Sequence, residues 1–265
     1  MNRIQLCDTL PGTNFEKTTG IGTQHPLLET ATRDVEHSVF VPLHYEPNYS
    51  YPLLVWLHGP GDDQQQLKKI MPLISMRNFM GVSPCGTALE AGKKDSPTYS
   101  GYTWRQEAHD IAVCEERVTQ CIERVSSRFN VRQSRIFIGG YDSGGTMALR
   151  MAMMRPELFS GVVSVGGCFP RGLNPLTRIG AIRNLPVMML HGRDSTEYGA
   201  MEACKDLRLT HTAGMSVAIR QYPCEQEVTT VMLEDVNRWL MDIVSGTVVQ
   251  SAANDWQSQN DPFDN

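Results

Sequence analysis

The most informative segment of the chain is residues 135–145, RIFIGGYDSGG, in which an apolar run leads into glycines around a single carboxylate. Small residues two positions before and after a reactive side chain are typical of a sharp strand-to-helix turn, because larger side chains there would collide across the turn. Gly140 and Gly144 have this spacing around Asp142. A frame shifted by one residue would put Tyr141 where a small residue is needed. We therefore interpret Asp142 as the residue presented at the tip of the turn.

Two other segments accompany this turn. Residues 51–63 read YPLLVWLHGPGDD and residues 185–194 read LPVMMLHGRD. With the turn, they resemble the phospholipase/carboxylesterase family, in which such segments form the strand and oxyanion loop, the nucleophile turn, and the strand that delivers the acid. The resemblance covers residues 37 to 244 in the family's order. It implies a three-layer α/β-hydrolase fold, with a mainly parallel central sheet and helices on both faces.

The resemblance also implies a catalytic triad, from which this chain departs. Asp142 stands where the family carries its nucleophilic serine. The family's histidine follows the last strand, where this chain reads YPCEQE over residues 222–227, so Gln226 takes the histidine position. Glutamine forms hydrogen bonds but does not act as a general base near neutral pH. No histidine follows His211, which falls in a predicted helix and which we interpret as a solvated or capping residue.

The acid position is disturbed as well. The family's aspartate stands four residues after the strand-end histidine, a position held here by Ser195, and Asp194 lies one residue early. A slipped loop would still present Asp194, so we group it with Asp142 and Gln226 as the degenerate triad. Asp194 is equally well explained as a turn residue.

The predicted oxyanion loop lacks one donor by covalent structure. In the family, one donor is the N–H of the residue after His-Gly, which here follows Gly59 and is Pro60. Proline has no N–H, and losing one such donor typically lowers turnover about 10²–10³-fold. Ser143 still offers the second N–H, from the position after the tip. We interpret His58 as a structural residue beneath the loop.

Two functions remain open from these residues. The first is a non-catalytic pseudo-esterase, kept as a binding or interaction module. The second is a hydrolase in which Asp142 attacks carbon, as in haloalkane dehalogenases and epoxide hydrolases. The second step of that reaction needs a histidine base, which the predicted site lacks. This absence favours the non-catalytic pseudo-esterase. A small-molecule ligand above Asp142 is compatible with both, and we predict neither a cofactor nor a metal site.

Composition excludes several classes of function. The 265 residues are 41% apolar with a net charge of −5, and the lack of a Lys/Arg cluster argues against nucleic-acid or membrane partners. The N-terminus does not have a signal peptide's apolar run, so we expect a cytoplasmic protein. Seven scattered cysteines indicate reduced thiols packed as small apolar side chains, with no disulfide framework or zinc site. The oligomeric state is left open.

Periodicity predicts one domain over residues 36–244, after an irregular segment at residues 1–35 and before a flexible polar tail at residues 245–265. Strands and helices alternate through this domain, which favours a mainly parallel sheet. The predicted strands are residues 38–42, 53–57, 79–83, 135–139, 161–166, 186–190 and 216–222. The predicted helices are residues 105–129, 143–154, 199–213 and 228–244.

Overall fold

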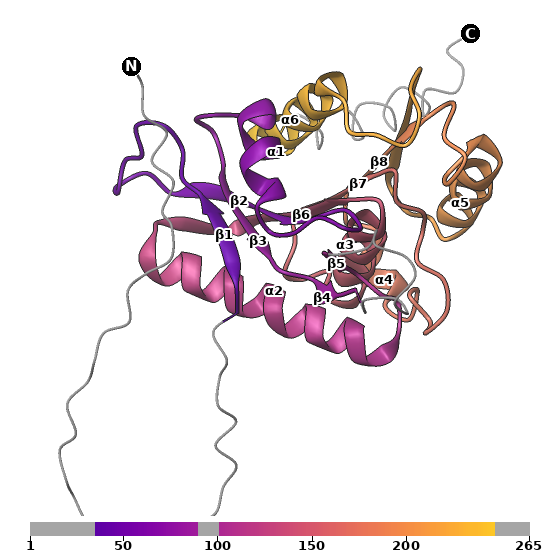
Figure 1. Ribbon diagram of the computed structural model, residues 1–265, viewed down its shortest axis with the longest axis horizontal. Helices are drawn as coiled ribbons and strands as arrows, with labels where there is room; N and C mark the ends of the chain where they lie inside the picture. The colour runs from indigo at the N-terminus through magenta and orange to yellow at the C-terminus, as the bar shows by residue number, and fades with distance from the viewer. Residues whose placement is uncertain (1–34, 90–100, 247–265) are drawn as a thin grey trace, which may run out of the picture.

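The computed structural model describes residues 35–89 and 101–246 of the chain (Figure 1). Its main element is a seven-stranded sheet with the order β1-β3-β2-β6-β7-β8-β9. Only β1 runs antiparallel, against β3, and the other neighbouring strands are parallel. The strands are β1 His37–Phe40, β2 Tyr51–Leu57, β3 Met80–Pro84, β6 Val131–Tyr141, β7 Gly161–Val165, β8 Val187–Gly192 and β9 Val217–Tyr222.

The central strands are buried on both faces. Every residue of β2, β3, β7 and β8 is buried. A strand covered on both sides is mostly apolar, which explains why these segments read as nearly continuous apolar runs, interrupted only by Ser83, Ser164 and His191. The carboxyl ends of the parallel strands lie along one edge of the sheet, and ligand sites in open α/β sheets form outside that edge.

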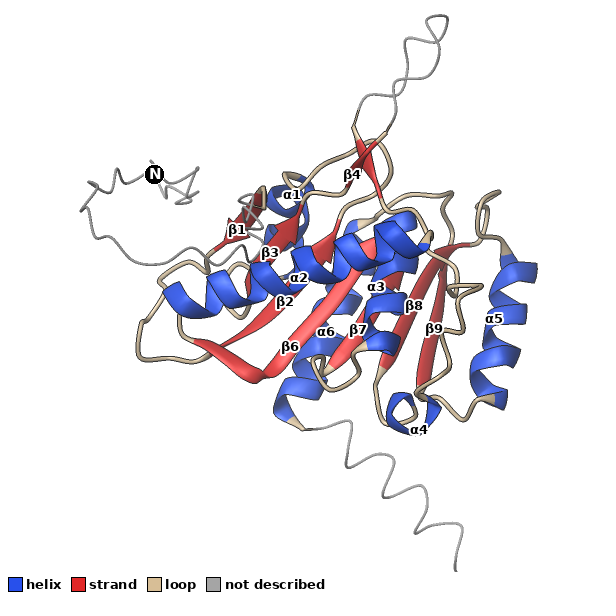
Figure 2. Ribbon diagram, turned by 90° about the horizontal axis from the view of Figure 1, so that it is seen from below, coloured by secondary structure: helices blue, strands red, loops and turns tan. Residues whose placement is uncertain are grey.

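Helices cover both faces of the sheet, as Figure 2 shows. One core packs α2 (Ala108–Arg128), α3 (Ser143–Met154) and parts of α4 (Ile179–Ile182) and α5 (Ala200–Thr212) against one face. The other core packs α1 (Gln66–Ile74) and α6 (Thr230–Ser245) against the opposite face. The helix α3 follows β6 directly, so the turn between them opens at the carboxyl edge of the sheet.

The seven strands and four long helices expected from the sequence are present within a few residues of their predicted bounds. The sequence prediction missed α1, α4 and the short antiparallel pair β4 (Thr87–Ala88) and β5 (Tyr102–Thr103). The helix α1 begins in a glutamine run and contains Pro72, which is unfavourable inside helices. It forms because Leu67, Ile70, Met71 and Ile74 bury one face of the helix.

Most of the cysteines pack as expected. Cys85, Cys114 and Cys121 are buried, and burial raises the pKa of the Cys85 thiol to about 11. Cys204 is exposed on α5, so its packing in a core was predicted wrongly. The segments 1–34 and 247–265, where we expected an irregular segment and a flexible tail, lie outside the described residues. Among the described helices, none is long and apolar enough to cross a membrane.

Candidate functional site

Asp142 occupies the tip of the turn between β6 and α3. Its backbone has φ 52° and ψ −118°, a strained conformation for a residue with a side chain. A Cβ on Gly140 would lie 2.5 Å from Gly144, and one on Gly144 would lie 2.3 Å from the Leu57 carbonyl oxygen. The two glycines therefore allow the turn, as their spacing predicts. Ser143 is the first residue of α3, and its Oγ lies 3.3 Å from Oγ1 of Thr103.

A chain of hydrogen bonds joins the three triad positions. The Nε2 of Gln226 donates to Oδ2 of Asp142 at 3.3 Å and to the Gly166 carbonyl at 2.8 Å. The Oγ of Ser195 donates to Oε1 of Gln226 at 2.7 Å and accepts from the Tyr198 N–H at 3.0 Å. The residues at the positions of nucleophile, histidine and acid are thus connected in the order of a triad, but through an amide.

The neighbours fix the direction of this chain. The carbonyl of Gly166 only accepts, so the nitrogen of the Gln226 amide must face it. The hydroxyl of Ser195 already accepts from Tyr198, which leaves its proton for Oε1 of Gln226. Each donor therefore points toward Asp142, and such chains polarise one another.

Tyr141 holds the loop that carries Gln226. Its hydroxyl donates to the Gln226 backbone carbonyl at 2.6 Å. Its ring also lies against the oxyanion loop, since a Cβ on Gly59 would be 2.5 Å from Cδ1 of Tyr141. The sequence prediction used Tyr141 only to choose the frame of the turn and missed this role. The only sign of this role in the sequence is that a tyrosine stands directly before the residue at the tip.

Asp194 and His211 lie apart from these bonds. The carboxylate of Asp194 is about half exposed and pairs with Arg193, with Nε–Oδ1 and Nη2–Oδ2 distances of 3.0 and 3.1 Å. Ser195, the other residue that the spacing suggested, contacts Gln226 instead. His211 is exposed near the end of α5, in agreement with its interpretation as a solvated residue.

The oxyanion loop is built around a buried histidine. The ring of His58 bonds to the backbone through both nitrogens, with Nδ1 donating to the Gly59 carbonyl at 2.8 Å and Nε2 accepting from the Gly86 N–H at 3.0 Å. Burial lowers the pKa of His58, which keeps the ring neutral in this role. The N–H of Gly59 is directed at Oε1 of Gln66, 3.3 Å away. Pro60, the next residue, adds no donor.

The remaining oxyanion donor faces the carboxylate of Asp142. Burial raises the pKa of Asp142, and the charge of Glu197 acts in the same direction. Hydrogen bonds from Gln226 and from the Ser143 N–H oppose the shift. The loss of water outweighs these hydrogen bonds, so the carboxylate of Asp142 ionises less readily than a free one. The Ser143 N–H thus has the Asp142 carboxylate as a close neighbour.

The surroundings of the site do not resemble a metal centre. Among the described residues, no three His, Cys, Asp or Glu side chains gather closely enough to hold a metal ion. Burial raises the pKa of the neighbouring Tyr141 hydroxyl to about 12, and the charges of Asp142, Glu227 and Glu197 act in the same direction. The site therefore has an excess of negative charge, and no described histidine hydrogen bonds to Asp142.

Comparison with known proteins identifies the family. The family model for phospholipase/carboxylesterase matches residues 47–243. The chain belongs to the phospholipase/carboxylesterase family. A curated relative in this comparison, a putative esterase from Nocardia uniformis subsp. tsuyamanensis, is 24% identical over 145 residues. That match spans 53% of this chain but only 39% of the relative's length.

Solved structures agree with this family at the level of the fold. The Bacillus cereus carboxylesterase superimposes with a TM-score of 0.61 at 15% identity, over 80% of this chain and 96% of that chain. Acyl-protein thioesterase 2 from Zea mays gives a TM-score of 0.61 at 15% identity, over 79% and 99%. The predicted α/β-hydrolase fold of this phospholipase/carboxylesterase family member is confirmed.

Proposed function

We propose that this protein is a non-catalytic member of its family, a pseudo-esterase whose pocket above Asp142 serves binding or interaction. The hydrogen-bonded chain Ser195–Gln226–Asp142 carries this proposal. In an esterase triad, the middle residue takes a proton from the nucleophile and returns it to the leaving group. The amide nitrogen of Gln226 has no lone pair available as a base near neutral pH, so the chain orients Asp142 without transferring a proton.

The oxyanion loop supports the same proposal. A tetrahedral intermediate needs preorganised donors directed at its negative oxygen. Pro60 removes one of the family's donors, and the N–H of Ser143 lies beside the carboxylate of Asp142, whose pKa it lowers. A negative oxygen formed at this position would also be repelled by Asp142 itself. We infer that the site places a carboxylate where an esterase would stabilise a negative oxygen.

The alternative is a hydrolase with Asp142 as nucleophile. The position of Asp142 favours it, because the strained tip leaves the carboxylate only partly buried. The first step is balanced: a carboxylate oxygen bonds to carbon and a halide or alkoxide leaves. Hydrolysis of the resulting ester then needs a base to activate water, and the residue in position for this is Gln226. The intermediate would therefore accumulate.

Two assays on the purified full chain test the proposal. The first is hydrolysis of p-nitrophenyl acetate and butyrate, with Asp142→Ala as the matched control. We expect neither protein to show saturable hydrolysis above a buffer blank. The second is intact-mass measurement after incubation with 1-bromobutane, where we expect no added butyl group. Wild-type turnover, or a butyl adduct, that disappears in Asp142→Ala would overturn the pseudo-esterase proposal and establish the nucleophile.

A further inference from the structure

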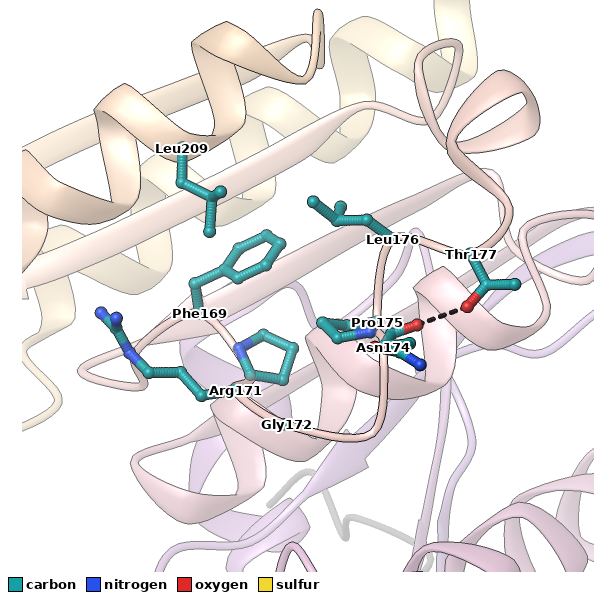
Figure 3. Close-up of a pocket in the computed structure, with 9 residues that line it drawn as sticks. Phe169, Arg171, Gly172, Asn174, Pro175, Leu176, Thr177 and Leu209 are labelled. Carbon is teal, nitrogen blue, oxygen red and sulfur yellow. Dashed lines mark hydrogen bonds between the residues drawn. The ribbon is translucent and has the colours of Figure 1, made fainter.

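A cavity lies between α5 and the connection that follows β7. It has a volume of about 540 Å³, within the range of ligand pockets. The side chains of Phe169, Leu176 and Leu209 converge on it, as Figure 3 shows, and Arg171 stands at one end. We call this cavity, lined by residues 169–172, 174–177 and Leu209, the groove. Its residues take no part in the Asp142 site.

Exposed apolar side chains gather beside the groove. Of the seven large apolar side chains exposed on the described residues, four belong to the connection after β7 or to α5, namely Leu173, Met201, Leu207 and Leu209. Met201 and Leu209 are eight residues apart on α5, with Lys205 between them, and therefore share one face of the helix. Exposed fractions of 59% for Leu173 and 73% for Met201 are unfavourable for side chains without a partner.

The charge of these segments is opposite to that of the whole protein. Residues 169–183 include three arginines and no acidic residue, whereas the chain has a net charge of −5. On α5, the two acidic residues are balanced by Lys205 and Arg208. The Nη2 of Arg171 bonds to Oδ1 of buried Asp206 at 2.9 Å and lies 3.5 Å from Oε2 of Glu202, whose Oε1 accepts from Lys205 at 2.6 Å. Exposed fractions of 58% for the Arg171 side chain and 53% for that of Lys205 leave both cations open to a partner. This face of the molecule favours an acidic partner.

Two buried side chains hold the main chain that lines the groove. Arg150, of which 1% is exposed, donates to the carbonyls of Arg171 at 2.7 Å and Gly172 at 3.2 Å. The carboxylate of Asp206 accepts from the Phe169 N–H at 2.8 Å. A partner therefore meets a surface that is already ordered, which lowers the entropy cost of binding.

Leu173, at the edge of the groove, has a strained backbone and an exposed side chain. Leu173 and Asn174 follow Gly172 with φ values of 52° and 46°, in the left-handed region that Asn tolerates and Leu rarely adopts. Gly172, at 69°, belongs to the same turn. A leucine kept in this conformation costs stability, so its presence at an exposed rim indicates a use for its side chain.

We propose that the groove docks an acidic segment of a partner protein through one large apolar side chain. That side chain enters between Phe169, Leu176 and Leu209, while Leu173 and Met201 cover it. Flanking carboxylates of the segment face Arg171 and Lys205. Apolar anchors set beside arginine are typical of the central residues of protein interfaces.

Fluorescence anisotropy on the full chain tests this proposal, with a fluorescein-labelled peptide of sequence Asp-Glu-Leu-Phe-Asp-Glu as the probe. We expect saturable binding that weakens about tenfold or more in Leu209→Glu, which places a like charge in the groove. We expect several-fold weaker binding in Leu173→Asn, which suits the left-handed backbone but removes the apolar side chain. Binding should also weaken between about 50 and about 300 mM salt, because the charges are exposed.

Matched controls distinguish docking at the groove from nonspecific binding. Val231→Asn removes an exposed apolar side chain from α6 and should leave binding unchanged. The peptide Lys-Lys-Leu-Phe-Lys-Lys should not bind. The absence of saturable binding, equal binding of the two peptides, or equal affinity in Leu209→Glu would overturn the proposal. A concentration-dependent dimer in sedimentation, abolished by Leu209→Glu, would instead make a second copy of this chain the occupant.

Discussion

The hydroxyl of Ser195 lies 2.7 Å from Oε1 of Gln226 and donates its proton there. In a working triad, this position holds a carboxylate that accepts from an imidazole and stabilises its charged form. Here the direction of the hydrogen bond is reversed, because the Ser195 hydroxyl donates and the amide oxygen of Gln226 accepts. The hydrogen bond from Ser195 orients the Gln226 amide. Asp142 therefore has a hydrogen-bond donor beside it where an esterase would have a general base.

Rebuilding a triad should therefore require position 195. We predict that Asp142→Ser, Gln226→His, Ser195→Asp and Pro60→Leu together give measurable turnover of p-nitrophenyl acetate. The same variant with Ser195 retained should be at least about 10²-fold slower, because Asp194 faces Arg193 and leaves the imidazole unoriented. Equal rates from the two variants would show that Asp194 reaches the site. Asp142→Ser alone should stay inactive, since its hydroxyl has no base.

The raised pKa of Asp142 should appear in the pH dependence of stability. Burial raises this pKa above its ordinary value of 3.8, so the folded state binds more protons than the unfolded state between the two values. Stability must then fall as the pH rises through that window. We predict that Asp142→Asn, which does not ionise, gains stability relative to wild type as the pH rises above about 4. Urea unfolding from acid to neutral pH measures this difference, and a constant or shrinking difference would contradict it.

The turn should not tolerate a methyl group at Gly144. A Cβ there would lie 2.3 Å from the Leu57 carbonyl oxygen and 2.4 Å from that of His58. Both contacts are with backbone, which yields little, so we expect Gly144→Ala to lose about 3 kcal/mol or more of unfolding free energy. Gly180→Ala is the control, because its Cβ would meet nothing within 4 Å and alanine favours its helix. Similar unfolding midpoints for the two variants would refute the clash.

Arg150 should stabilise the protein more than an exposed arginine does. Its Nε also donates to Oε1 of Gln106 at 2.6 Å, so Arg150→Met removes the donor from three partly buried acceptors. We predict a loss of about 2 kcal/mol or more, with faster amide exchange in residues 169–177. Arg178→Met, which breaks an exposed pair with Glu157, should cost about 1 kcal/mol or less. Chemical unfolding and hydrogen exchange measure both effects.

Tyr141→Phe tests how the loop of Gln226 is held. The variant keeps the ring against Gly59 and removes the 2.6 Å bond to the Gln226 carbonyl. We expect a loss of about 1 kcal/mol and increased amide exchange in residues 223–229. Unchanged exchange in that loop would mean that the side-chain bonds of Gln226 hold it without Tyr141.

The fold and the tip of the site were predictable because they depend on local pattern. Apolar runs located the buried strands, and the spacing of Gly140 and Gly144 placed Asp142 at the turn, since backbone geometry over five residues is a local property. The absence of a donor at Pro60 is a covalent fact, independent of the fold. The helix α1 was missed because Pro72 and the glutamines oppose its local preference, which burial of one face overrides.

Tertiary structure decided everything that depends on distant partners. Asp194 and Ser195 are neighbours in the chain, and only the fold determines which one meets Gln226, 31 residues from Ser195. The raised pKa of Asp142 follows from burial, which no spacing reveals. The groove likewise exists because buried Arg150 and Asp206 hold a loop, residues 169–177, whose sequence FPRGLNPLT has no helical or strand periodicity. The sequence by itself determined which chemical groups are present and how the chain bends around Asp142, whereas their contacts required segments far apart in sequence to pack together.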